Sequence, residues 1–269
     1  MEKLNTKKAG MDIKAISILV CLVASFAFII PVLSIGTALD KDPTIQEIIS
    51  KAEMRQQAIK DSIRDAIYTG KAMYKELDKN GSIKKDVVIN RRVYIKQDGK
   101  RHEEYISMFV DGKELTKKEI EKERKEWQKK NGSNETKMPL SKEAKRDYEY
   151  ELIGNSIFNG VPVWIIEFTS KKKEDGYING KGYIHKDKYD IIHAEFTPAK
   201  MSSVIRDMSM SLSYCEVQGY WLPSKFEMDM KVNVKFVLSM YYKQIKVEDV
   251  YTQYKINCGL QDSLFESKG

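Results

Sequence analysis

The sequence is poor in the residues that build most catalytic and metal sites. It holds only 3 cysteines and 3 histidines in 269 residues. The histidines, His102, His185 and His193, lie at no metal-ligand spacing to one another, to a cysteine or to an acid. We therefore expect them at the surface, and we predict neither a metal nor a cofactor.

Sequence motifs of catalysis are missing as well. The chain has no GxSxG nucleophile motif, no phosphate-binding glycine loop and no dinucleotide fingerprint. Its carboxylates are plentiful, but nothing in their spacing selects a catalytic pair. We assign no catalytic residue and predict that the protein is not an enzyme.

The chain has no long uncharged run after residue 40, but it has one long uncharged run before that residue. The stretch "AISILVCLVASFAFIIPVLSIGTAL" lies between Lys14 and Asp40, behind a head that carries three further lysines. A basic start, an apolar middle and small residues near the end are typical of a secretory signal. We expect residues 1–38 to be that signal and 39–269 to form one exported domain. The alternative is an uncleaved membrane anchor formed by residues 15–39.

Cys215 and Cys258 remain after such a cleavage. An even pair in an oxidising compartment is compatible with a disulfide, and free, half-buried thiols are the alternative that we favour.

An amphipathic helix is expected directly after residue 43. Thr44 and Glu47 have the spacing of a capping box. The apolar residues that follow recur at helical spacing and form one stripe. We expect this helix to lie as a lid over an apolar surface, and the long strand described next is the obvious candidate. The lid residues are Ile45, Ile48, Ile49, Ala52 and Ile59.

Most of the remaining chain alternates between apolar and polar residues, as half-buried strands do. Asn80-Gly81, Asp98-Gly99 and Asp111-Gly112 mark turns between consecutive antiparallel strands. The alternation is longest in "KFEMDMKVNVKFVLSM", residues 225–240, which as one strand would span roughly 50 Å. A turn at Gly219 would place this strand beside "DMSMSLSY". The predicted apolar set is Met208, Met210, Leu212, Phe226, Met228, Met230, Val232, Val234 and Phe236.

Residues 113–146 form a charged insert with twelve Lys or Arg and seven Asp or Glu. Thr116 and Glu119 form a second capping box, Leu115 and Ile120 a hydrophobic staple, and Asn131-Gly132 a stop signal. We expect one exposed helix, anchored by Ile120 and Trp127. Glutamates interleaved with the basic residues are more typical of a solvated, salt-bridged face than of a nucleic-acid interface.

The order of these elements resembles the LolA-like family of outer-membrane lipoprotein-sorting proteins. The resemblance spans roughly residues 44 to 257 and is strongest in the strand that begins Gly180-Lys-Gly-Tyr-Ile-His, in Trp221-Leu-Pro223 and in the final strand near Tyr254. It implies an α+β fold, a curved antiparallel sheet that forms an unclosed half-barrel. The N-terminal helix and further short helices would then cover its concave apolar face.

The resemblance also implies a function: a monomeric periplasmic carrier or chaperone for lipoprotein acyl chains or a similar lipid. The nine residues of the apolar set would line its cavity, and a membrane-associated protein would donate or accept the cargo. The family's carriers hold the lid helices with a basic strand residue. Arg91, Arg92 and Arg206 are candidates for that position here, but none of them can be matched to it and we assign the role to none. The alternative is an envelope sensory or structural module on the same fold, packed solid and acting through protein contacts.

Overall fold

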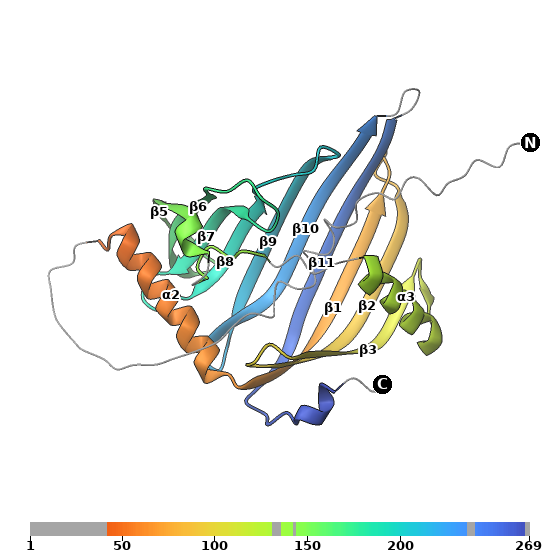
Figure 1. The fold of residues 1–269 in the computed structure, drawn as a ribbon, viewed down its shortest axis with the longest axis horizontal. Coiled ribbons are helices and arrows are strands. Elements are labelled where there is room, and N and C mark those ends of the chain that lie inside the picture. Colours follow the sequence, from red (N-terminus) through yellow and green to blue (C-terminus); the bar gives the residue numbers. More distant parts are fainter. Residues whose placement is uncertain (1–41, 131–135, 142–143, 236–239, 267–269) are drawn as a thin grey trace, which may run out of the picture.

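The computed structural model describes residues 42–130, 136–141, 144–235 and 240–266 (Figure 1). The predicted signal sequence, the stop signal at Asn131-Gly132 and Phe236 lie outside these ranges. Within them, no helix combines the length and the hydropathy needed to cross a membrane. Cys215 and Cys258 are free thiols.

Helices α2 and α3 begin where the caps predicted. Helix α2 spans Ile45–Ser62, and its N-cap Thr44 forms the complete capping box with Glu47. Helix α3 spans Lys117–Lys130, and the Glu119 carboxylate accepts hydrogen bonds from the backbone and hydroxyl of Thr116. Both predicted N-termini are therefore confirmed.

Eleven strands form one antiparallel sheet in the order β4-β3-β2-β1-β11-β10-β9-β8-β7-β6-β5. The chain first lays down β1 (Asp65–Leu77), β2 (Ile83–Lys96), β3 (Arg101–Val110) and the short β4 (Lys113–Glu114). After α3 and a short 3-10 helix, η2 (Lys145–Asp147), it returns at the opposite edge with β5 (Tyr148–Phe158), β6 (Val161–Ser170) and β7 (Ile178–His185). The sheet is completed by β8 (Ile191–Pro198), β9 (Ile205–Val217), β10 (Tyr220–Lys235) and β11 (Met240–Ile256), and a second 3-10 helix, η3 (Asp262–Leu264), follows.

The sheet is an open half-barrel, as predicted, because its edge strands β4 and β5 lie at opposite ends of the order and do not pair. The first and last long strands, β1 and β11, pair with each other in the middle. Figure 1 shows α2 over the part of the sheet that contains β7 to β9, and α3 over β2 and β3.

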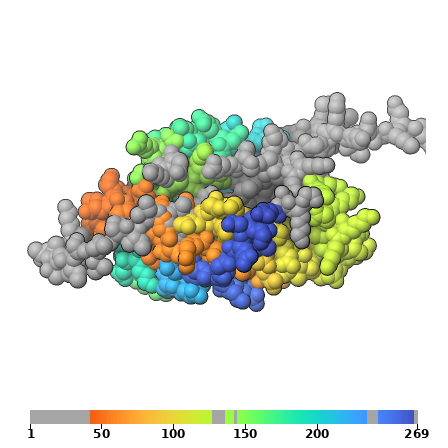
Figure 2. All heavy atoms as spheres, turned by 60° about the horizontal axis from the view of Figure 1, so that its bottom comes forward, coloured from red at the N-terminus to blue at the C-terminus, as the bar shows by residue number. Residues whose placement is uncertain are grey.

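The C-terminal segment after β11 contacts the start of β1 and the end of β2 at one edge of the sheet. Figure 2 shows the C-terminal residues, in blue, beside the start of β1 and the β2–β3 hairpin, in orange and yellow. The Asp65 carboxylate accepts backbone hydrogen bonds from Cys258, Gly259 and Leu260. Burial acts to raise the pKa of Asp65, but the hydrogen bond from the Cys258 thiol together with these backbone bonds lowers it below its ordinary value. Lys96 Nζ lies 2.8 Å from Asp262 in η3.

One strand prediction is wrong. Residues 225–240 do not form a single strand, because β10 ends at Lys235 and Met240 begins β11 directly opposite it. The chain therefore reverses between these residues. The predicted turn at Gly219 is confirmed, and β10 begins immediately after it, at Tyr220.

Gly180 in β7 sits where the sheet leaves no room for a side chain. A Cβ atom there would lie 2.0 Å from the carbonyl oxygen of Glu195 in β8 and 2.7 Å from the Cα of Phe196. Gly182, two residues on in the same strand, would meet nothing within 4 Å. The two glycines therefore form a matched pair for testing the packing of this part of the sheet.

We predict that Gly180→Ala lowers the free energy of unfolding by about 1–3 kcal/mol, the usual cost of overpacking, because β7 and β8 must move apart. Gly182→Ala is the control, and it should change stability much less. Urea denaturation followed by circular dichroism measures both. Equal losses of stability in the two variants would show that the close approach of β7 and β8 at Gly180 does not make an added side chain unfavourable there.

Candidate functional site

One face of the sheet carries a row of apolar side chains that runs from β2 to β6. Met210 in β9 lies opposite Met228 in β10, and Met228 lies opposite Val247 in β11. Cross-strand partners share a face, so these residues form a transverse row. The row continues to Tyr74 and Val87 on one side and to Phe196 and Phe168 on the other.

The predicted apolar set occupies the centre of this face. Its members on β9 and β10 whose side chains are described are at most 3% exposed, and the predicted pairing of the two strands is confirmed. In the observed register Met208 opposes Met230, Met210 opposes Met228, and Leu212 opposes Phe226. Val232 opposes Ile205. The side chain of Val234 and all of Phe236 lie outside the described parts of the structure. The central strands are therefore brought together as expected; whether they contact a ligand stays a prediction.

The segment that leads into β5 helps to cover the middle of the face. Ala144 and Tyr148 belong to the same buried cluster as the methionines, and Met138 packs against it. The Tyr148 hydroxyl donates to the carbonyl of Lys137 at 2.5 Å and accepts from the backbone N–H of Ile178. Part of the predicted charged insert is thus core rather than an external extension.

Helix α2 covers a different region from the one expected. Ile48 and Ala52 are fully buried against Trp164 and Ile166 of β6 and Ile184 of β7, not against the long strand. The central cluster already contains Ala144 and Tyr148, which occupy the place expected for the helix. Of the other predicted lid residues, Ile45 and Ile49 pack against the cluster on β6 and β7, and Ile59 is also buried.

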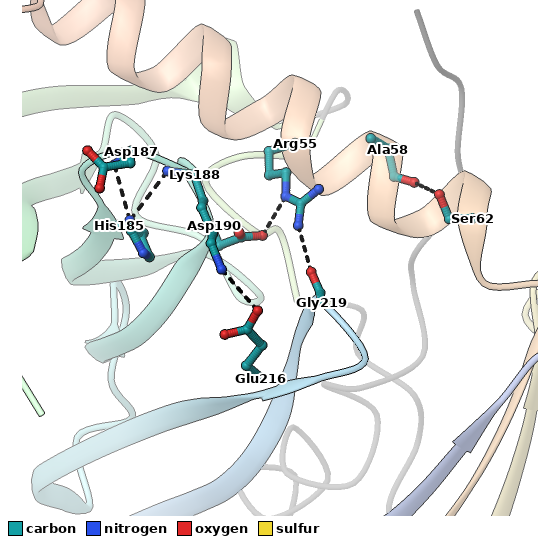
Figure 3. A network of polar contacts seen from close by, with 9 residues as sticks. All are labelled: Arg55, Ala58, Ser62, His185, Asp187, Lys188, Asp190, Glu216 and Gly219. Carbon is teal, nitrogen blue, oxygen red and sulfur yellow. Dashed lines mark hydrogen bonds and ion pairs between the residues drawn. The ribbon is translucent and has the colours of Figure 1, made fainter. Parts of the chain in front are cut away.

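A polar network fastens α2 to two turns of the sheet (Figure 3). Arg55 Nε lies 2.7 Å from Asp190 Oδ1, and its Nη2 donates to the carbonyl of Gly219 at 3.0 Å. Asp190 is fully buried. Burial raises the pKa of this carboxyl, and Arg55 opposes the rise. The basic residue that holds the helix therefore comes from the helix itself.

The turn between β7 and β8 is itself ordered by polar contacts in the same network. His185 Nδ1 accepts hydrogen bonds from the backbone N–H groups of Asp187 and Lys188. Lys188 Nζ reaches Glu216 of β9 at 2.9 Å. The turn that carries Asp190 is therefore held by contacts of its own in addition to the one with Arg55 (Figure 3).

Helix α3 covers the other half of the apolar face. Ile120 packs with Val87 of β2 and Met108 of β3, and Leu115 joins them as the predicted staple. Beneath the helix lies a cavity of about 80 Å³, lined by residues of β1, β2, β3, β10, β11 and α3. Of the predicted cavity residues only Phe226 lines it.

Charged side chains lie within this otherwise apolar half. The Arg91 guanidinium on β2 donates to the Asp249 carboxylate on β11, and Arg101 of β3 binds Glu103 of the same strand. Arg101 Nη1 also donates to the hydroxyl of Tyr68 at 3.2 Å. Asp249 and Glu103 keep the pKa of Arg91 high although burial acts in the opposite direction. The cluster holds two cations and two anions, so it carries no net charge.

A second hollow among the described residues lies on the opposite face and does not fit an apolar ligand. Its volume is about 1070 Å³. It is lined largely by polar side chains such as Glu195, Ser211, Glu227 and Lys246. A chain of methylenes would displace water from charged groups there without pairing them, which is unfavourable. We therefore place the candidate site on the apolar face.

The histidines offer no alternative site. His193 is buried, contrary to the expected surface position, because it stacks on Phe158 with ring centroids 4.6 Å apart and its Nδ1 lies 3.0 Å from the Ser213 hydroxyl. Burial lowers the pKa of His193. Among the described residues, no group of three or more His, Cys, Asp or Glu is placed to hold a metal ion.

Together, these features define an open half-barrel whose apolar face is covered by helices. A family model with the description "-like: Uncharacterized protein" matches residues 116–268, more than half of the chain, and the chain belongs to that family. No curated protein matches the sequence.

Three solved structures illustrate what the fold is similar to. A DUF1329 family protein from Desulfovibrio piger is 16% identical, with a TM-score of 0.43, over 83% of this chain and 97% of that one. A putative outer membrane lipoprotein-sorting protein domain from Vibrio parahaemolyticus is 14% identical, with a TM-score of 0.40, over 81% and 94%. A LolA superfamily protein from Nitrosomonas europaea is 11% identical, with a TM-score of 0.35, over 83% and 98%. All three likenesses concern the arrangement of the sheet and its helices.

We predict that Arg55→Ala lowers the free energy of unfolding by about 1–3 kcal/mol near neutral pH, because Asp190 loses its buried partner. Without Arg55 the pKa of Asp190 rises further above its ordinary value of 3.8, so the folded state binds the proton more tightly than the unfolded chain. Stability is therefore gained as the pH falls through the raised pKa toward 3.8, and the deficit of the variant shrinks.

Urea midpoints at about pH 7.5 and about pH 4.5 measure this dependence. Asp190→Asn is the control, because it keeps the shape of the side chain and removes its titration. The difference in urea midpoint between Asp190→Asn and the double variant Arg55→Ala/Asp190→Asn should be the same at both pH values. A deficit of Arg55→Ala that is equal at both pH values would contradict the assignment.

Proposed function

We propose that this protein is an exported, non-enzymatic carrier that binds an acyl chain between the apolar face of the half-barrel and its helices. The supporting observation is the extent of that face, which runs from Val87 in β2 to Phe168 in β6. The proposed cargo is a lipoprotein or another acylated molecule in the bacterial envelope. The proposed process is outer-membrane lipoprotein sorting.

The cavity beneath α3 is the proposed entry point. Its floor includes the apolar side chains of Ala72, Ile89 and Phe226, and its roof is a helix with a single fully apolar anchor in the described part, Ile120. Each buried methylene contributes about 0.8 kcal/mol, so a chain of about ten would supply roughly 8 kcal/mol before the costs of binding. We expect α3 to move outward to admit such a chain.

Native mass spectrometry of the protein purified from the envelope of its own host tests the proposal, with organic extraction to identify what is bound. We expect an acylated species near one per protein. An empty protein that also fails to bind added lipopeptide would contradict the carrier function.

A cavity-filling variant locates the site. Ala72→Phe places a ring in the cavity beneath α3 and should reduce recovery of the bound species at least about tenfold, since the chain loses its volume and several methylene contacts. Lys71→Phe is the matched control, because Lys71 is the exposed neighbour on the other face of the same strand. Equal recovery from both variants would exclude this cavity as the site.

The second candidate is an envelope interaction module that acts through protein contacts. It is favoured by the exposed basic residues of α3, which include Lys118, Lys122 and Lys125. Deleting the insert would remove the buried Ala144 as well, so reversing the charge of these three lysines is the cleaner test. A carrier should retain its ligand in that variant, whereas an interaction module should lose its partner.

A further inference from the structure

Arg91 and Asp249 are two opposite charges in the apolar face, and they meet across a strand that lies between them. Arg91 is on β2 and Asp249 on β11, and β1 separates these strands. Gly70 of β1 makes the contact possible, because a Cβ there would lie 3.2 Å from Arg91 Cζ. Arg91 is 6% exposed and Asp249 8%.

The pair does not satisfy its own hydrogen-bonding groups. Arg91 uses Nη2 for Asp249 Oδ2, and the Tyr251 hydroxyl also interacts with the Asp249 carboxylate. The buried atoms Arg91 Nε and Asp249 Oδ1 have no hydrogen-bond partner in the described structure. The nearest anion to Nε is Glu103 Oε1 at 3.9 Å, beyond hydrogen-bonding distance. Both residues line the cavity beneath α3. One donor and one acceptor therefore lie unpaired at the end of an apolar cavity.

The surrounding charges restrict what can bind there. Arg91 and Arg101 balance Asp249 and Glu103, and α3 adds Glu123 and Arg124 to the lining. A carboxylate, phosphate or ammonium group would enter as a buried charge without a counter-charge, which is costly. A neutral group that both accepts and donates a hydrogen bond meets no such cost.

We infer that the Arg91–Asp249 pair is the polar end of the acyl site and binds a neutral head group. This head accepts a hydrogen bond from Arg91 Nε and donates one to Asp249 Oδ1, as a secondary amide or a hydroxyl does. The inference rests on the proposed carrier function and names the class of acyl compound that the carrier selects: N-acyl amides or acyl alcohols rather than free fatty acids or charged lipids.

Four probes with the same twelve-carbon chain test the head-group preference: N-methyldodecanamide, N,N-dimethyldodecanamide, dodecanol and dodecanoate. Their affinities are measured by displacement of a fluorescent fatty-acid analogue. The secondary amide should bind at least about tenfold more tightly than the dimethyl amide, which lacks the donor, and than dodecanoate. Dodecanol tells an amide head group from a hydroxyl head group. If a hydroxyl is enough for binding at the pair, dodecanol binds as tightly as the secondary amide.

The double variant Arg91→Met/Asp249→Leu links the preference to the pair. Replacing a buried ion pair by apolar residues of similar size usually preserves the fold. This variant should keep its affinity for the dimethyl amide and lose the tenfold preference. Lys225→Met/Glu227→Leu is the matched control, because it removes an ion pair of 2.7 Å on the opposite face. Circular dichroism checks the fold, and Arg91→Lys, which keeps the charge and lacks the Nε donor, replaces the double variant if that one does not fold.

The outcomes separate the two proposals. If wild-type protein binds the probes without discrimination, or if the preference survives in the Arg91 variants, the polar-end assignment is overturned and the pair is a structural ion pair. If wild-type protein binds none of the four probes, the carrier function itself fails, and the inference falls with it.

Discussion

The apolar face of an open sheet has to be covered by something other than the sheet. In a closed barrel the strands shield one another's inner face, but here β4 and β5 remain unpaired with each other and the face stays accessible from above. Each buried Met, Phe or Leu on it contributes about 1.5–3 kcal/mol only while it is kept from water. Helix α2, the segment that leads into β5, and helix α3 each cover a separate part. The stability of the domain therefore depends on these covers.

Much of this architecture could be predicted because its signals are local. A threonine and a glutamate three residues apart set the start of each helix, and Asn-Gly or Asp-Gly pairs set three turns. Alternation gave the matched faces of β9 and β10, since register follows once the turn is known. The reversal after Lys235 was missed because residues 236–239, "FVLS", contain no glycine, proline, asparagine or aspartate and the apolar alternation continues across them.

The polar parts of the site depend on distant pairings and were not predicted. Arg55 and Asp190 are 135 residues apart, and nothing in the helix alone distinguishes Arg55 from a solvated residue. Arg91 and Asp249 did leave a signal. Each occupies an apolar position in an alternating strand, Arg91 between Ile89 and Val93 and Asp249 between Val247 and Tyr251. A charge at such a position indicates a partner on the same face of the sheet. The sequence does not identify that partner, because only the strand order shows that β2 and β11 both lie next to β1.

The two helices are fastened to opposite halves of the sheet. Helix α2 depends on β6, β7 and the turns at Asp190 and Gly219, whereas α3 depends on β2 and β3. In the described parts of the chain these two sets of contacts fall on different strands and turns, so a substitution that weakens one set leaves the other in place. Under the carrier function that we propose, displacing one helix would open one end of the apolar face while the other end stays covered.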